Sequence, residues 1–118
     1  QIIQTFINYA PEALQLTDGF GGLPIHRACA YGASLEVIQA LVNSFPEGLK
    51  VTNCDGNLPL HAACRGGASL DVVTFLIESY PESVKVTDDH SNLPLHYACR
   101  GAASLEVITF LIESYPKS

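Results

Sequence analysis

The sequence predicts an all-α fold, an elongated solenoid of stacked helix-turn-helix repeats, and three observations support this prediction. Four blocks of the 118-residue chain align at a fixed offset of 35 residues, and they start at Ile2, Val37, Val72 and Val107. Self-similarity with a period of about 20–50 residues is typical of repeat architectures. Prolines, glycines and apolar runs recur in phase with this period. No residues remain for a linker, so we expect one domain over 1–118, with a partial N-terminal repeat at 1–17 and repeats that start near residues 18, 53 and 88.

The first helix of each repeat, helix A, is expected to begin at a proline. Proline suits the first turn of a helix, because its missing N–H would have had no partner inside the helix. The predicted starts are Pro24, Pro59 and Pro94, and the predicted ends lie near Tyr31, Gly66 and Gly101. A leucine precedes each proline and cannot cap the helix, so Asn57 and Asn92 are candidate caps one residue earlier.

The second helix, helix B, follows a glycine-centred break. Its candidate N-caps are Ser34, Ser69 and Ser104, each with an acidic residue two positions later that suits the helix dipole. The helix is apolar around most of its circumference, which predicts that it is packed between other elements. A proline then stops it, at Pro46, Pro81 and Pro116, and turn-rich segments such as NCDGN lead to the next helix A.

These repeats resemble the ankyrin repeat family. The stretch from Asp18 to Cys29 reads D-x-x-G-x-x-P-I-H-x-A-C and recurs twice more, close to the family's usual D-x-x-G-x-T-P-L-H-x-A. A tetratricopeptide array has a similar period and is the alternative solenoid, but the helix that starts with PLH and the long turn-rich segment favour ankyrin repeats. The period is 35 residues instead of the usual 33. Asn53, Ser91 and Ala102 also depart from the pattern, so we expect the last repeat to be less regular.

Composition excludes several classes of function. Six basic against twelve acidic residues give a net charge of −6, which opposes binding to nucleic acid. No apolar run approaches the roughly 18 residues needed to span a bilayer, and the N-terminal residues do not resemble an export signal. Cysteines at one repeat position are too far apart for disulfides, so we read them as reduced thiols of an intracellular, cytoplasmic protein.

A histidine precedes a cysteine by three residues in each repeat, in the pairs His26–Cys29, His61–Cys64 and His96–Cys99. Residues three apart share a helix face, but two ligands do not make a zinc site, which needs four. We therefore expect each histidine to satisfy backbone groups and each cysteine to act as a small buried apolar residue, with no metal and no cofactor. Cys54 alone breaks the repeat, and the acidic residue beside it disfavours a reactive thiolate, so we expect no catalysis.

The resemblance implies that function lies where the copies differ, on the concave surface of turn tips and helix A. The candidate partner-binding residues there are Phe20, Arg27, Tyr31, Asp55, Arg65, Asp89, His90, Tyr97 and Arg100. Arginine and tyrosine are enriched at binding hot spots. We expect a groove for an acidic or aromatic-bearing segment of a protein partner. The alternative is that these arginines are merely solvated along their own scaffold.

The terminal repeats keep apolar residues where solenoids usually carry polar caps. FLIESYP at 110–116 is identical to the internal copy at 75–81, and the chain opens with the apolar segment QIIQTFI. We therefore expect the chain to be a fragment of a longer array, or its ends to be covered by another copy through end-to-end self-association. The remaining alternative is a purely structural segment, or a consensus-designed scaffold, without a ligand of its own.

Overall fold

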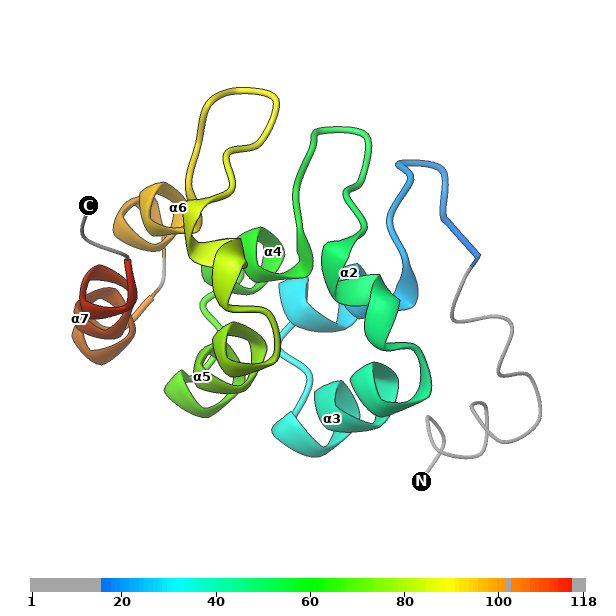
Figure 1. Cartoon of the computed structure of the whole chain (residues 1–118), viewed down its shortest axis with the longest axis horizontal. Coiled ribbons are helices and arrows are strands. Elements are labelled where there is room, and N and C mark those ends of the chain that lie inside the picture. The colour runs from blue at the N-terminus through cyan, green and yellow to red at the C-terminus, as the bar shows by residue number, and fades with distance from the viewer. Residues whose placement is uncertain (1–15, 102, 116–118) are drawn as a thin grey trace.

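A computed structural model describes residues 16–101 and 103–115, and these residues form a row of helix pairs (Figure 1). Helix A of the successive repeats is α2 (Pro24–Ala30), α4 (Pro59–Arg65) and α6 (Pro94–Arg100). Helix B is α3 (Leu35–Ser44), α5 (Leu70–Ser79) and α7 (Leu105–Ser114). Short 3-10 helices follow two of them, η2 (Pro46–Lys50) and η3 (Pro81–Lys85). The described chain contains no strand, which confirms the predicted all-α class.

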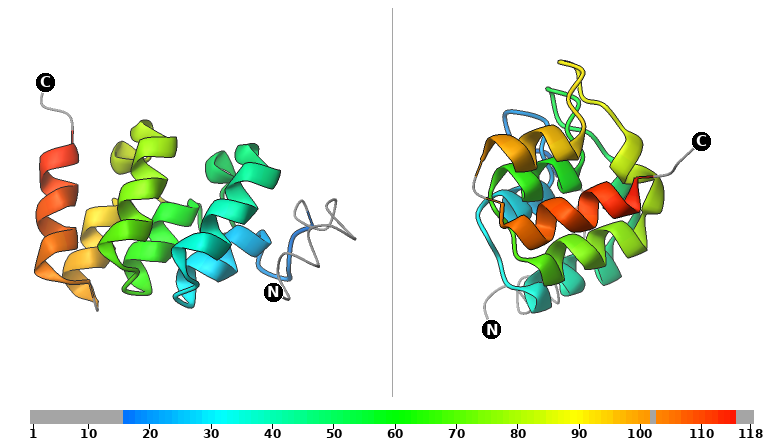
Figure 2. Two further views of the ribbon diagram at one scale, coloured as in Figure 1. Left: turned by 90° about the horizontal axis from the view of Figure 1, so that it is seen from below. Right: turned by 90° about the vertical axis from the view of Figure 1, so that its left-hand side faces the viewer.

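The helices form two layers. The inner helices α2, α4 and α6 lie beside the turn-rich segments, and the outer helices α3, α5 and α7 lie on the side away from them (Figure 1). Viewed along the row, the successive pairs lie behind one another (Figure 2, right). Three extended loops project beyond the inner helices, and we call them finger 1 (16–23), finger 2 (51–58) and finger 3 (86–93). The arrangement is the predicted stack of repeats.

The inner helices begin at the predicted prolines, but their caps differ from the prediction. Asn57 and Asn92 do not cap α4 and α6, and the N-cap residues are Leu58 and Leu93, without a capping side chain. Instead, the histidine three residues into each helix reaches back, and Nδ1 of His61 accepts a hydrogen bond from the Leu58 N–H at 3.0 Å. The imidazole can reach this N–H from inside the first turn, which leaves the asparagine side chains free for other contacts.

The outer helices begin as the sequence predicted. Ser34, Ser69 and Ser104 are their N-caps, and each hydroxyl oxygen accepts the N–H three residues later. The apolar faces of these helices pack on the inner helices and on their neighbours in the row. The most deeply buried side chains of the outer helices are Ile38, Leu76, Val73, Val107 and Leu111. This packing between elements explains why helix B is apolar on most sides.

The fingers share one turn design. In finger 1, Oδ1 of Asp18 accepts the N–H of Phe20 at 2.8 Å and of Gly22 at 3.0 Å. Asn53 makes the same two contacts in finger 2, and Ser91 adopts the left-handed conformation, with φ of 65°, that glycine has in the other fingers. The expected irregularity is therefore absent at these two positions. Ala102 and residues 1–15 of the partial repeat expected at 1–17 lie outside the described residues.

Adjacent fingers are tied together by one backbone hydrogen bond at each junction. The N–H of Cys54 donates to the carbonyl of Phe20 at 2.8 Å, and the N–H of Asp89 donates to the carbonyl of Asp55 at 2.9 Å. These bonds hold the finger tips in a row beside the inner helices. None of the helices in the described ranges is long and apolar enough to cross a bilayer.

Candidate functional site

The buried histidines link neighbouring repeats. Nδ1 of His26 accepts the Leu23 N–H at 3.0 Å, so the ring proton must lie on Nε2, which donates to the carbonyls of Val51 at 2.9 Å and Asn57 at 3.1 Å. His61 repeats this arrangement one period later. Burial lowers the pKa of both histidines, because it disfavours the charged ring. The prediction that these histidines satisfy backbone groups is confirmed.

The cysteines of the repeats are not equivalent. Cys29 and Cys64 are buried, and desolvation raises the pKa of each thiol to about 12, which makes them poor nucleophiles. Cys99 was expected to be buried and is exposed, as is Cys54. No described element packs over Cys99 as α4 and α6 pack over the preceding copies. Among the described residues, no three metal-ligating side chains gather at one place.

Two hollows lie between the fingers and the inner helices. The first hollow lies between repeats 1 and 2, and the second hollow lies beside finger 3 and α6. Predicted residues that line the first hollow are Phe20, Arg27, Tyr31, Asp55 and Arg65. Those that line the second hollow are Asp55, Arg65, His90, Tyr97 and Arg100. Asp89 lines neither hollow. A further hollow between the outer helices α5 and α7 contains none of the predicted residues.

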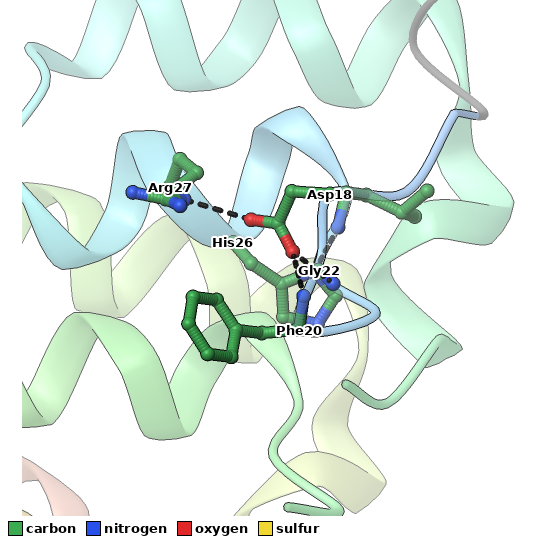
Figure 3. A network of polar contacts seen from close by, with 6 residues as sticks. Asp18, Phe20, Gly22, His26 and Arg27 are labelled. Carbon is green, nitrogen blue, oxygen red and sulfur yellow. Dashed lines mark hydrogen bonds and ion pairs between the residues drawn. The ribbon is translucent and has the colours of Figure 1, made fainter. Parts of the chain in front are cut away.

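In repeat 1, Arg27 of α2 holds finger 1 in place. Nε of Arg27 donates to Oδ2 of Asp18 at 2.8 Å, while the other carboxylate oxygen accepts the two finger N–H groups (Figure 3). The hydrogen bond from Arg27 is the largest of the contributions that lower the pKa of Asp18 to about 2. The guanidinium also lies 5.9 Å from the ring centroid of Tyr31. Arg27 is therefore partly engaged within its own repeat.

In repeat 3, a tyrosine takes the same position. Tyr97 is only 9% exposed, and its hydroxyl donates to Oδ2 of Asp88 and accepts from Nδ2 of Asn92 at 3.5 Å. Desolvation raises the pKa of Asp88, but hydrogen bonds, first from Tyr97, outweigh it and lower that pKa to about 2. Arg100 lies over the Tyr97 ring at 5.4 Å and donates to Oδ1 of Asn92 at 3.1 Å. Tyr97 supports finger 3 and presents little surface to a partner.

Arg65 differs from the other two arginines. It lines both hollows and is exposed, and within the described residues its side chain has neither a hydrogen bond nor an ion pair. Asp55 also lines both hollows, from the tip of finger 2. Phe20 and Tyr31 are 66% and 77% exposed at the edge of the first hollow. The most available recognition groups therefore gather around repeat 2.

The first hollow is also lined by residues that the sequence did not indicate as partner-binding, among them Asn53 and Asn57. Asn57 is 5% exposed, and its Oδ1 is buried with no hydrogen-bond partner among the described residues. Both asparagines were assigned to turn or cap roles because they occupy repeated positions. One feature of the sequence does point to them. Ala62 stands at the repeat position where repeats 1 and 3 have the long side chains of Arg27 and Tyr97, which leaves space beside the two asparagines.

The described stack is a helical solenoid in which each repeat contributes a finger and a pair of helices, and this defines a class of repeat protein. The ankyrin repeats match the chain in three copies, over residues 1–88 and 25–117. The chain therefore belongs to the ankyrin repeat family, whose members generally serve as protein-binding modules. A comparison of the sequence with curated proteins gave no significant match.

Proposed function

We propose that this chain binds a protein partner, without catalysis, through the surface formed by its fingers and inner helices. The partner segment lies across both hollows and carries acidic or aromatic side chains. The single observation that supports this proposal most is the position of Arg65, a cation that lines both hollows and has no partner of its own among the described residues. Exposed aromatic rings at Phe20 and Tyr31 add contact area beside it.

Charge supports an acidic partner in spite of the negative net charge of the chain. The hollows contain the side chains of Arg65 and Arg100, while Glu106 and Glu113 are found on the outer helix α7. Asp18, which pairs with Arg27, and Asp55 also line these hollows. An acidic side chain of the partner would therefore meet complementary charge where it lies beside Arg65 or Arg100, and this would orient the bound segment. The unpaired cysteines are consistent with an intracellular setting for this interaction.

The test is a selection of peptides from a random display library against the chain, followed by affinity measurements on two charge-reversal variants. Arg65→Glu changes a residue that lines both hollows. Lys85→Glu makes the same change in net charge on η3 and is the matched control, because Lys85 lines neither hollow. We expect at least a roughly tenfold loss of affinity for Arg65→Glu only. Equal affinities for both variants would refute the proposed surface, and a selection without binders would favour a purely structural role.

We also propose that the α6–α7 end of the described stack binds a second copy of the chain. At this end, Leu105 is 77% and Ile112 is 55% exposed, although their counterparts in the preceding repeats are half-buried or buried. His96 is exposed. Nε2 of His61 contacts two carbonyls, whereas within the described residues no carbonyl lies in the same place beside Nε2 of His96. A second copy would cover this apolar area.

Sedimentation over a range of concentrations tests this association. We expect the parent to form a species larger than the monomer, and Ile112→Glu to shift the equilibrium to the monomer, because a charge would be buried in the contact. Glu113→Gln, at the neighbouring exposed position, is the control and should associate like the parent. A parent that remains monomeric at all concentrations would refute this proposal.

A further inference from the structure

We propose that the first hollow is a binding slot for the phenol group of a tyrosine side chain, supplied by the partner. This inference rests on the proposed function and specifies the chemistry of one anchor. It comes from a comparison of repeat 2 with repeat 3 of the same chain, in which the corresponding space is filled by Tyr97.

The surroundings of the Tyr97 phenol are present again one period earlier. In repeat 3 the ring lies edge-on to His61 at 6.0 Å between centroids, beneath Arg100, with its hydroxyl between Asp88 and Asn92. The counterparts 35 residues earlier are His26, Arg65, Asn53 and Asn57, and all four line the first hollow. The counterpart of Tyr97 is Ala62, which also lines it. Repeat 2 therefore has the walls of a tyrosine site without the tyrosine.

The polar groups of this slot fit a hydroxyl. Oδ1 of Asn53 accepts the N–H of Asp55 at 2.9 Å and the N–H of Asn57 at 3.0 Å. The other end of this amide is therefore the donor Nδ2. It takes the place that the acceptor Oδ2 of Asp88 has in repeat 3. Oδ1 of Asn57 is a buried acceptor without a donor among the described residues. Oδ1 of Asn57 has almost no surface open to the hollow, so the Asn57 amide must turn toward the hollow when the ligand binds. A phenol hydroxyl would then accept from Asn53 and donate to Asn57. This is the reverse of the polarity in repeat 3, where the hydroxyl donates to Asp88 and accepts from Asn92.

The turn residue is an aspartate in the two repeats whose helix residue can donate a hydrogen bond to it, and an asparagine in the repeat whose helix residue cannot. The turn residue and the helix residue nine positions later are Asp18 with Arg27 and Asp88 with Tyr97, and both pairs are joined by a side-chain hydrogen bond. In repeat 2 the pair is Asn53 with Ala62, which cannot form one. A buried polar group without a partner is costly, so a ligand that supplies the missing donor gains affinity. The hollow has a volume of about 520 Å³, which lies in the range of ~300–1,000 Å³ typical of binding sites.

The experiment is an NMR titration of the isotope-labelled chain with p-cresol, the side-chain analogue of tyrosine, and in parallel with toluene, which lacks the hydroxyl. We expect p-cresol to bind with a dissociation constant of order ~1 mM and to shift the side-chain amide signals of Asn53 and Asn57. Toluene should bind at least roughly tenfold more weakly, because it leaves both amides unpaired. An absence of shifts at the two amides, or equal responses to p-cresol and toluene, would overturn the inference.

A variant that fills the slot from inside the chain provides the second arm. Ala62→Tyr should abolish p-cresol binding, whereas Thr109→Tyr, which adds the same side chain on the outer helix α7, should leave it unchanged. If Ala62→Tyr still bound p-cresol as the parent does, the slot would be wrongly placed. The Arg65→Glu test with selected peptides is independent of this result. Peptides that depend on Arg65 in a chain that ignores p-cresol would leave the binding surface in place and remove only the phenol slot.

Discussion

Replacing His61 with alanine tests whether the histidines of the repeats are structural links. The change removes the acceptor of the buried Leu58 N–H and the Nε2 donor shared by the carbonyls of Val86 and Asn92. Nε2 has one proton for both carbonyls, so its contacts count as one interaction. The hydrogen bond to Nδ1 is the second interaction that is lost. A buried polar group left without its partner costs about 1–3 kcal/mol, so the expected loss of stability is about 2–6 kcal/mol. The cavity left by the ring adds to this value.

The repeat supplies its own control in His96. This imidazole is exposed, and among the described residues its one hydrogen bond is from the Leu93 N–H at 2.8 Å. An exposed hydrogen bond can be replaced by water, so we expect His96→Ala to cost only about 0.5–1.5 kcal/mol. Urea unfolding followed by circular dichroism at about pH 7.5, where free histidine is neutral, measures both variants. Equal losses for the two variants would refute the argument that contact with the next repeat makes the inner histidine important.

Three further predictions concern pH, thiol reactivity and helix spacing. The two buried histidines have lowered pKa values, so on acidification the unfolded chain takes up protons before the folded chain does. The urea midpoint of unfolding should therefore fall as the pH drops below about 6.5. A midpoint that stays constant down to about pH 5 would contradict this. Ellman's reagent should label Cys54 and Cys99 at once and the other two thiols only after unfolding, so a third fast thiol in the native chain would contradict the burial. A Cβ at Gly66 would overlap the carbonyl oxygen of Ala30, so Gly66→Ala should cost about 1–3 kcal/mol, measured by the same urea unfolding. At Gly101 the nearest atoms are 3.4 Å away, so Gly101→Ala should cost less than about 1 kcal/mol, and equal costs would contradict the close approach of α4 to α2.

The features that depend on local chemistry could be predicted from the sequence. A proline at the first turn and a serine before an apolar helix identify helix starts wherever they occur, so Pro59 and Ser69 mark their helices correctly. The cap of helix A could not be predicted in this way, because the choice between Asn57 and His61 depends on which side chain reaches the Leu58 N–H in three dimensions. The η helices after Pro46 and Pro81 were also missed, because a proline that ends one helix can start a 3-10 turn.

Features that depend on the neighbouring repeat were predicted less well. Cys64 and Cys99 occupy the same repeat position, yet one is buried and the other exposed, because burial is provided by the next helix pair and not by the cysteine's own repeat. For the site, the sequence identified both Arg65 and Tyr97 as variable residues. It could not show which of the two side chains is available to a partner. Only the hydrogen bond to Asp88 shows that the tyrosine supports finger 3, while the arginine remains available.

A chemical-shift map of the labelled chain bound to one of the selected peptides would locate the binding surface residue by residue. If binding uses the fingers and inner helices, the largest shifts will fall around the two hollows, with Arg65, Asp55 and Tyr31 among the residues most affected. If the largest shifts fall instead on the outer helices, around the hollow between α5 and α7, the proposed binding surface is wrong.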